Sequence, residues 1–327
     1  MLPPVRTDEE WDAIVPDEAV MRPGAADLCA RLGVAGVPLT RFREGSQPVY
    51  AVGDDLVLKL FPAAAADDGV TEARVLAHVH GRLPVATPRV HSWGAYENGW
   101  RYVLMSQLPG ESLHHAWPRV PGADRERLVE RAGRTLAALH ALDHAPLAGA
   151  LGPGDWDAFL ARQRAGAVER QRARHLPEHW LEQIPDFLDA VAGVGERAAE
   201  SAGERAAQAP AAGGRRALLH TEFMREHLLA APAPDGRWEL TGLFDFEPAM
   251  IGDPAYDFVA VGLYVTRADP RLLARFTSAY GRAFEPRRLL AHTLLHVYSN
   301  LPRYLRELPA PPEPTLDALA EHWFGRG

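Results

Sequence analysis

A single lysine stands inside an apolar stretch of the chain. The run Leu56–Phe61, which reads LVLKLF, has the length and composition of a buried strand, and Lys59 is its one charged residue. Of the 35 lysine and arginine residues in the sequence, Lys59 is also the one lysine. A general preference for arginine explains this depletion, but it does not explain why a lysine persists here. Lys59 therefore either faces solvent at a sheet edge or serves a site that needs a compact ammonium group.

Further short strands are predicted on both sides of this run. Leu39–Arg43 and Pro48–Val52 precede it, separated by turn sequences, and Arg89–Trp93 and Trp100–Met105 follow it. These runs predict a five-stranded antiparallel sheet. A short helix over Pro23–Leu32 is expected before the sheet.

One main helix is predicted between the third and fourth strands. The segment Val70–His80 has an apolar face, and Glu72 lies in its first turn. Alone, Glu72 is an acid that the helix dipole favours near a helix N-terminus. Together with Lys59 on the preceding strand, it fits the ion pair between a strand lysine and a helix glutamate in kinase-like folds.

The chain changes character near residue 107. The segment Ser106–Gly110 reads SQLPG and is typical of a hinge, so we expect one unit over residues 1–107 and a second over 108–327. The second unit is expected to be mostly helical, and Gly203–Gly214 reads as a low-complexity surface loop. The expected helices are 125–142, 153–172, 178–199, 254–265, 268–282, 286–305 and 315–324.

Two acid-bearing motifs stand out in the second unit. The tripeptides HTE at 220–222 and DFE at 245–247 each lie beside strand-like residues, and His227 follows Glu222 at an offset of five. This layout is that of a phosphoryl-transfer centre. In such a centre, one side chain orients the attacking hydroxyl and two others hold Mg²⁺ on the nucleotide phosphates.

Composition excludes several classes of protein. A net charge of −8 does not favour a nucleic-acid partner. Cys29 is the one cysteine, which excludes a disulfide framework. The first twelve residues contain no apolar signal segment, and no apolar run reaches membrane-spanning length. We therefore expect a cytoplasmic protein without a membrane partner.

A zinc hydrolase is a weaker interpretation of the same residues. His220 and Glu222 form an H-x-E pair as in zinc deaminases, and His227 would add a ligand. That signature also requires P-C-x-x-C, which a chain with a single cysteine lacks, and H-E-x-x-H is absent as well. Without a Walker A sequence or a well-placed G-x-G-x-x-G, P-loop and Rossmann nucleotide sites are also excluded.

The order of these motifs resembles the aminoglycoside phosphotransferase family. The resemblance spans about residues 38–265 and rests on Lys59, Glu72, the LMSQLPG hinge, the LAALHAL segment and the run FDFEPAMIGDPAYDF. Within the family, the chain looks most like hygromycin B phosphotransferases. The implied fold is α+β and bilobal, like that of protein kinases. A five-stranded antiparallel sheet with one main helix would form the nucleotide-binding lobe, and a mostly helical lobe would carry catalysis and substrate binding.

The resemblance also implies a nucleotide site in the first lobe. In the family, a strand lysine contacts the α- and β-phosphates and pairs with a helix glutamate, a glycine-containing loop positions the nucleotide, and hinge backbone groups meet adenine. The matching positions here are Lys59, Glu72, Gly45, Ser46, Ser106 and Leu108.

The second lobe would supply the catalytic groups. Asp245 matches the principal Mg²⁺ ligand, while Asp253 and Asp257 match positions that usually brace the catalytic loop. Glu222 stands where the family has its catalytic aspartate, and His227 stands where it has an asparagine that is the second metal ligand.

These two departures leave three alternatives open. Glu222 is one methylene longer than aspartate, and Mg²⁺ prefers oxygen ligands to the imidazole of His227. Asp245 would then hold one Mg²⁺ alone, or the site would favour Mn²⁺ or another softer ion, or metal binding would be lost.

The resemblance implies an O-phosphotransferase that uses ATP, or GTP, and Mg²⁺ or Mn²⁺. Its substrate would be a small hydroxylated antibiotic, an aminoglycoside such as hygromycin B, whose modification confers resistance. Glu247 is the main candidate for contacting the ammonium groups of such a substrate, with weaker candidates at Asp155, Asp157 and Glu182. The alternatives are a kinase for another sugar- or nucleoside-type antibiotic or a metabolite, and an inactive pseudokinase that binds nucleotide or another ligand.

Overall fold

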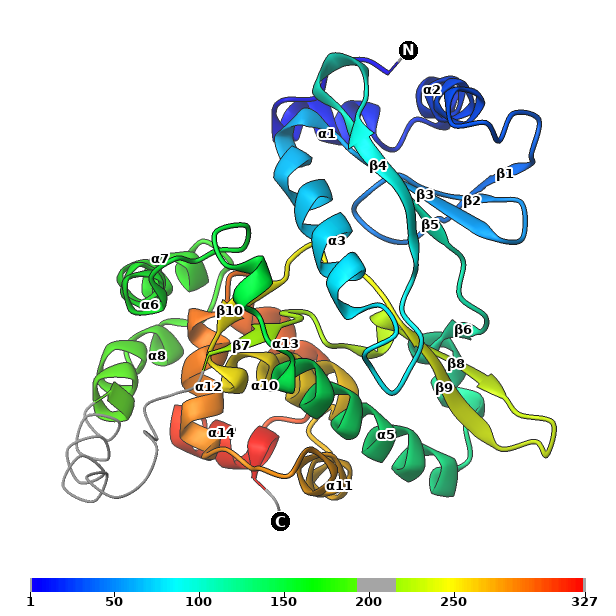
Figure 1. Cartoon of the computed structure of the whole chain (residues 1–327). Coiled ribbons are helices and arrows are strands. Elements are labelled where there is room, and N and C mark those ends of the chain that lie inside the picture. The colour runs from blue at the N-terminus through cyan, green and yellow to red at the C-terminus, as the bar shows by residue number, and fades with distance from the viewer. Residues whose placement is uncertain (1, 193–215, 326–327) are drawn as a thin grey trace. The chain divides into compact units, whose positions relative to one another are not determined.

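The computed structural model describes residues 2–192 and 216–325 and is shown in Figure 1. The loop predicted at 203–214 lies outside these residues. Contacts between residues divide the chain into two compact units. None of the described helices is both long and apolar enough to cross a membrane. Unit 1 comprises Met1–Glu111, Leu229–Ala231 and Thr241–Ala249, and unit 2 comprises Ser112–Leu228, Pro232–Leu240 and Met250–Gly327.

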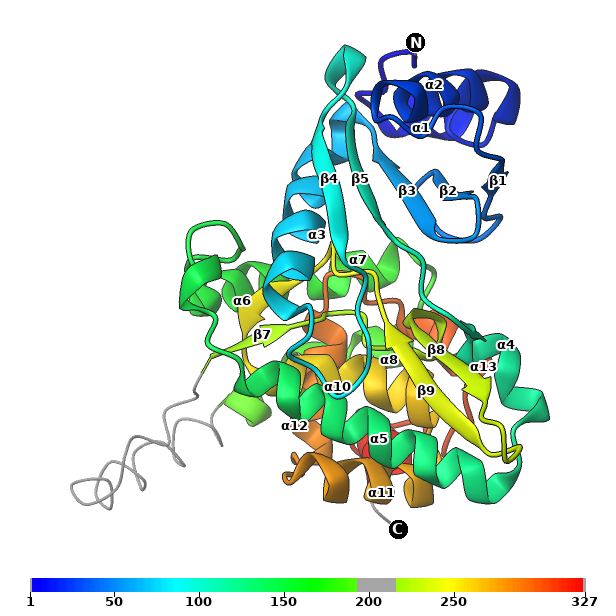
Figure 2. The ribbon, with the colours of Figure 1, turned by 45° about the vertical axis from the view of Figure 1, so that its right-hand side comes forward.

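Unit 1 is built on a five-stranded antiparallel sheet, which confirms the prediction. The strands lie in the order β1-β2-β3-β5-β4, so β3 is central (Figure 2). The short helix η2 (Glu97–Gly99) lies in the connection between the last two strands. The strands are β1 (Leu39–Arg41), β2 (Val49–Val52), β3 (Leu56–Phe61), β4 (Val90–Ala95) and β5 (Arg101–Ser106).

Alternate residues of β3 face opposite sides of this sheet. Leu58 and Leu60 belong to one apolar core, whereas Lys59 and Phe61 face the side where η1 (Ala63–Ala65) leads into helix α3 (Ala66–Val79). Gly69 of α3 lies so near the strand that a Cβ atom there would come within 2.8 Å of the Phe61 ring. Lys59 is therefore buried at the centre of the sheet and only 5% exposed, and the alternative of a solvent-facing edge position is wrong.

Two N-terminal helices pack against the other face of the sheet. They are α1 (Asp8–Ile14) and α2 (Glu18–Arg31), and their core includes Met21 and Leu28 with Leu58 and Leu60 of β3. The sequence predicts a helix only from Pro23 onward, but α2 begins five residues earlier, where Asp17 caps Ala19 N–H at 2.9 Å. An aspartate N-cap outweighs the preference of proline for the first turn.

Unit 2 is mostly helical, as predicted. Its two-stranded antiparallel sheet pairs β7 (Ala217–Leu219) with β10 (Met250–Gly252). The chain also has a three-stranded sheet of order β6-β8-β9, with β6 at Glu111–Ser112, β8 at Leu228–Pro232 and β9 at Trp238–Leu243. This sheet is not a part of unit 2 alone, since Leu229–Ala231 and Thr241–Leu243 are assigned to unit 1. The α-helices are α4 (Leu113–Ala116), α5 (Gly122–Ala141), α6 (Trp156–Ala165), α7 (Ala167–Arg172), α8 (Glu178–Leu181), α10 (Asp257–Ala260), α11 (Pro270–Tyr280), α12 (Pro286–Leu295), α13 (Leu301–Glu307) and α14 (Leu316–Phe324). The short helical turns are η3 (Trp117–Arg119), η4 (Ala145–Leu147), η6 (Arg225–His227) and η7 (Pro254–Tyr256), and η8 (Val261–Thr266) is a π-helix.

Several helices predicted as continuous are broken in the structure. The predicted helix 286–305 consists of α12 and α13, with an irregular link at 296–300. Within this link, Val297 N–H donates to the Tyr256 hydroxyl at 2.9 Å instead of to a helical carbonyl. Asn300 then caps α13 by accepting from Arg303 N–H, and Pro302 lies in the first turn. Long-range contacts and a new N-cap thus divide a stretch whose apolar spacing alone favours one helix.

Candidate active site

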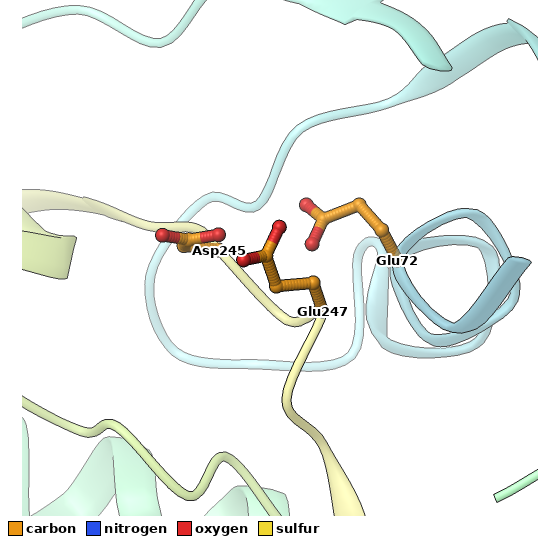
Figure 3. Close-up of side chains that lie close together, drawn as sticks. All are labelled: Glu72, Asp245 and Glu247. Atoms are coloured by element: carbon orange, nitrogen blue, oxygen red, sulfur yellow. The ribbon is translucent and has the colours of Figure 1, made fainter. Parts of the chain in front are cut away.

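Lys59 lies among three carboxylates in unit 1. Its Nζ atom is 2.7 Å from Glu247 Oε2 and 3.7 Å from Glu72 Oε2, and it also contacts Asp245 Oδ1. Figure 3 shows the carboxylates of Glu72, Asp245 and Glu247 gathered in one place. The predicted neighbours Lys59, Glu72 and Asp245 are therefore brought together, and Glu247 joins them.

Two elements besides β3 build this cluster. Glu72 is fully buried on the face of α3 that packs against the sheet. Asp245 and Glu247 come from the segment after β9, which is held in place by a hydrogen bond from Leu243 N–H to Ala86 O at 2.9 Å. Asp245 has a φ of +71°, a left-handed conformation that aspartate adopts more readily than most residues. With Phe246 buried between them, Asp245 and Glu247 both reach the lysine.

The charges in the cluster are strongly coupled. Burial opposes the charge of Lys59, but Asp245, Glu72 and Glu247 raise its pKa well above the usual range. Burial raises the pKa of Glu72 to about 8, against the opposing effect of Lys59, and burial also raises the pKa of Glu247. One ammonium thus faces three carboxylates, and the cluster has more acid groups than it can hold ionised without a further cation.

The same carboxylates could hold a metal ion. One oxygen from each of Glu72, Asp245 and Glu247 lies within 4.8 Å of the others. Carboxylate oxygens are the hard ligands that Mg²⁺ and Mn²⁺ prefer. The donor set therefore fits a divalent cation. The cation that Glu247 contacts in the structure is Lys59, although the sequence suggested a substrate ammonium.

The remaining residues predicted to bind nucleotide also lie in unit 1. Gly45 and Ser46 are exposed in the loop between β1 and β2, and Gly45 has a φ of +100°. At the end of β5, Ser106 N–H donates to Arg89 O, and Arg89 N–H donates to the Ser106 hydroxyl, both at 2.9 Å. A regular antiparallel pair would direct that second N–H to the Ser106 carbonyl. The side chain of Ser106 thus takes over a ladder bond, while Leu108 packs against Gly242.

Glu222 lies in unit 2, on the loop that follows β7. Asp257 anchors this loop, because its carboxylate accepts from His220 N–H at 2.9 Å and from Thr221 N–H at 2.6 Å. Thr221 has a φ of +72°, which is unusual for a β-branched residue and is often found at functional sites. The backbone before Glu222 is therefore held in a strained conformation by a buried carboxylate.

His296 holds the same peptide from the other side. Its Nε2 atom donates to Thr221 O at 3.3 Å, and its Nδ1 atom accepts from Tyr298 N–H at 3.2 Å. A protonated ring would direct a second N–H at the Tyr298 N–H. Burial lowers the pKa of His296 to about 4, so the neutral ring fits this position.

His227 is bonded to the backbone of Glu222. Its Nδ1 atom donates to Glu222 O at 2.9 Å, and its ring stacks on that of His220 with centroids 5.9 Å apart. In a neutral imidazole this bond puts the lone pair on Nε2, which is the usual arrangement of a histidine that binds a metal. The structure thus brings Glu222 and His227 together on one loop of unit 2.

The chain matches a known protein family. A family model described as "Phosphotransferase enzyme family" matches residues 38–292. The chain belongs to this phosphotransferase family. The predictions of an enzyme that transfers phosphate with ATP and of a kinase-like fold are thereby confirmed.

Solved structures of other phosphotransferases share the fold. A GDP complex of a mutant aminoglycoside 2'-phosphotransferase-IIIa is 18% identical to this chain, with a TM-score of 0.62. The match covers 84% of this chain and 86% of that chain. The GDP and kanamycin complex of APH(2")-IIIa is 17% identical, with a TM-score of 0.61, and the match covers 88% of this chain and 94% of that chain. The streptomycin–ATP–APH(2")-IIa complex is 14% identical, with a TM-score of 0.55, and the match covers 95% of this chain and 100% of that chain. The closer likeness to hygromycin B phosphotransferases stays a prediction.

The two aspartates that follow the DFE motif of this phosphotransferase differ in their contacts. Asp257 supports the loop that carries Glu222 and also accepts from His140 Nε2 at 2.9 Å. Asp253 caps η7 through Ala255 N–H and pairs with Arg288 of α12, so its contacts support neighbouring helices instead of the loop.

The sequence does not reveal the roles of His140 and His296, the two histidines that support the loop carrying Glu222. His140 enters the sequence analysis only as part of the LAALHAL segment, in which it lies two residues before the end. His296 was assigned to a continuous helix. Both act through contacts more than 70 residues away in the sequence, which spacing does not reveal.

Proposed function

We propose that this phosphotransferase moves the γ-phosphate of ATP, or of GTP, onto a hydroxyl group of a small antibiotic-like molecule. The observation that supports this most is the cluster in which Lys59 faces Glu72, Asp245 and Glu247. A buried ammonium beside carboxylates that can take a divalent cation suits the phosphates of a nucleotide. A divalent cation would reduce the repulsion among these carboxylates.

Lys59 would bind the α- and β-phosphates, with Glu72 keeping its side chain extended toward them. A phosphate oxygen would compete with Asp245 for the ammonium group and so release that carboxylate for a metal ion. Mg²⁺ or Mn²⁺ bound there would neutralise phosphate charge. We assign the ion to Asp245 and Glu247. His227 stays a candidate from the sequence alone, because it stands where the family has its second metal ligand.

The adenine or guanine base would lie along the segment after β5. Because Arg89 N–H bonds to the Ser106 hydroxyl, the Ser106 carbonyl is the group that a base amino group would meet, with the Leu108 backbone beside it. Gly45 and Ser46 would close over the phosphates, since Gly45 has the backbone freedom that such an approach requires.

Glu222 would position the acceptor hydroxyl and receive its proton. The hydroxyl oxygen attacks the γ-phosphorus in line, the bond to the β–γ bridging oxygen breaks, and the nucleoside diphosphate leaves. The anchoring of Thr221 by Asp257 and His296 fixes the backbone from which Glu222 extends. Such rigidity matters because small misplacements of a catalytic group cost rate.

The first acceptors to test are aminoglycosides. Two similar structures contain kanamycin and streptomycin, and resistance to such an antibiotic would be the biological outcome. Hygromycin B remains the specific substrate that the sequence suggests.

Nucleotide binding and transfer can be measured separately. We expect ATP with Mg²⁺ or Mn²⁺ to bind in isothermal titration calorimetry, and ADP release to follow when a suitable acceptor is added. Lys59→Met should lower nucleotide affinity at least tenfold, whereas Arg74→Met, which removes an exposed charge from α3, should leave it unchanged. Equal affinity of both variants would contradict the assignment of Lys59.

A pseudokinase is the second candidate, favoured by Glu222 and His227 at positions where the family has aspartate and asparagine. It predicts that nucleotide binds without transfer to any acceptor in the presence of Mg²⁺ or Mn²⁺. Transfer that appears only in the double variant Glu222→Asp, His227→Asn would support this candidate.

A further inference from the structure

A small cavity lies beside Glu222 within unit 2. Its volume is about 30 Å³, which is room for roughly two water-sized groups. Thr221, Glu222, Met224, Val259 and Ala260 are among the residues that line it. The remaining lining residues are His296 and three tyrosines, Tyr264, Tyr298 and Tyr304.

The three tyrosines all line this cavity. The rings of Tyr264 and Tyr304 are perpendicular, with centroids 6.1 Å apart, and their hydroxyls are hydrogen bonded to each other. The Tyr304 hydroxyl donates onward to Tyr298 O at 3.1 Å. Because these two hydroxyls are engaged, the aromatic surfaces are what a ligand would meet.

The backbone around the cavity is irregular on two sides. Tyr264 belongs to the π-helix η8, a rare conformation that is frequent at functional sites, and η8 ends at Arg267 and Ala268 with φ of +53° and +58°. Tyr298 lies in the break between α12 and α13 and is 51% exposed. Both tyrosines therefore lie at departures from regular helix, and Tyr298 is half-exposed beside the cavity.

Acidic groups are scarce at this cavity. Among the described residues that line it, Glu222 is the single carboxylate. Of the acids suggested for binding a cationic substrate, Asp155 caps α6 through Ala158 N–H, and Asp157 is 89% exposed near Arg216. Glu247 pairs with Lys59 in unit 1. The described residues that line this cavity thus do not include the several carboxylates that would bind several ammonium groups.

We propose that this cavity is the acceptor subsite and that it selects an uncharged hydroxylated molecule with an apolar or aromatic face, in preference to a polycationic one. The proposal rests on the assignment of Glu222 in the proposed function. The cavity takes a single CH₂–OH group and presents its hydroxyl to Glu222, while the rest of the molecule lies on Tyr298. Binding of this kind is driven by apolar contact and stacking, which salt screens little.

Five acceptor probes distinguish the effect of ligand charge on binding from the effect of apolar surface. They are phenyl β-D-glucoside, glucose, glucosamine and kanamycin, with choline added as a quaternary ammonium alcohol that tyrosines could bind through cation–π contacts. We expect the aryl glucoside to have the highest kcat/KM. Its KM should change less than about twofold between low and high salt, because no ion pair forms.

Variants of Tyr298 test the stacking surface. Tyr298→Ser should raise the KM for the aryl glucoside about three- to tenfold, as expected for the loss of one aromatic contact, while Tyr298→Phe keeps it within about twofold. Trp93→Ser is the matched control, since Trp93 is 42% exposed on β4. It should leave the KM unchanged.

Saturation-transfer NMR measures the binding of the same probes, and it tests the ligand preference of the subsite even if no probe is phosphorylated. Preference for kanamycin or choline, with a KM or Kd that rises strongly with salt, would overturn the proposal. It is also overturned if Tyr298→Ser has no effect or if the aryl glucoside does not bind. Failure of nucleotide to bind would refute the proposed function instead, and the NMR measurement would still test the subsite.

Discussion

The Thr221 N–H donates a 2.6 Å hydrogen bond to the buried carboxylate of Asp257. The same carboxylate accepts from the preceding N–H, that of His220, and from the side chain of His140. One aspartate thus fixes the left-handed turn from which Glu222 extends. The loop that carries Glu222 is therefore positioned by Asp257 of α10, which contacts neither nucleotide nor acceptor in the proposed reaction.

Asp257→Asn tests this positioning role. An amide accepts fewer hydrogen bonds than a carboxylate and presents an NH₂ group toward the loop N–H groups, so we expect unfolding free energy to fall by about 2–4 kcal/mol. We also expect kcat to fall at least thirtyfold with little change in nucleotide affinity. Asp253→Asn is the comparison, because it lowers stability through η7 and α12 but should retain most of kcat. Equal kcat losses in both variants would argue against a specific role for Asp257.

The buried His296 should make the protein less stable in acid. Its pKa is about 4 in the folded protein and 6.5 in the unfolded chain, so the unfolded state binds more protons between these values. Stability is therefore complete above pH 6.5 and falls as the pH drops toward 4, by about 3 kcal/mol in total. Urea unfolding at several pH values measures this slope.

His296→Gln should flatten that slope, because glutamine can still donate to Thr221 O and has no proton to gain in this range. The exposed His91→Gln variant is the control and should keep the wild-type slope. An unchanged slope in His296→Gln would show that another group causes the acid sensitivity.

His227 is expected to set the metal preference of the reaction. Its Nδ1–H bonds to Glu222 O, and a nitrogen ligand would suit Mn²⁺ better than Mg²⁺. We expect wild-type kcat/KM to be higher with Mn²⁺. In His227→Asn, the Mn²⁺-to-Mg²⁺ ratio of kcat/KM should fall at least fivefold. An unchanged Mn²⁺-to-Mg²⁺ ratio of kcat/KM would show that His227 is not a metal ligand.

Ser106→Ala tests the recognition of the base. Without the hydroxyl, Arg89 N–H is expected to return to the Ser106 carbonyl, which then competes with the base amino group. We predict that the KM for nucleotide rises about threefold to tenfold, the effect of losing one hydrogen bond. Ser106→Thr keeps the hydroxyl and should behave like wild type. Similar KM values for all three proteins would contradict the assignment.

Local patterns in the sequence predict much of unit 1. Lys59 and Glu72 follow each other on adjacent elements, so their pairing needs only the order of one strand and one helix. Glu247 shows the limit of this reasoning. Its tripeptide was recognised, but the lysine that it contacts lies far away in the sequence, and only the folded chain shows that Lys59 neutralises it.

The loop that carries Glu222 was harder to predict for the same physical reason. Its conformation depends on Asp257, His140 and His296, whose effects require packing between helices that are distant in sequence. The break before α13 did have local signals, since Asn300 and Pro302 are typical of a helix start. Apolar periodicity outweighed them in the sequence reading, and the exposed aromatic surface of Tyr298 was missed as a result.

The central claim is that phosphate passes from nucleotide to an acceptor hydroxyl with the help of Lys59. The most direct measurement is mass spectrometry of the acceptor after incubation with the protein, ATP or GTP, and Mg²⁺ or Mn²⁺. We predict a phosphorylated acceptor with wild type and Arg74→Met, and at least a hundredfold less with Lys59→Met. Undiminished product with Lys59→Met, or no product with wild type for any acceptor, nucleotide and metal, would contradict the account.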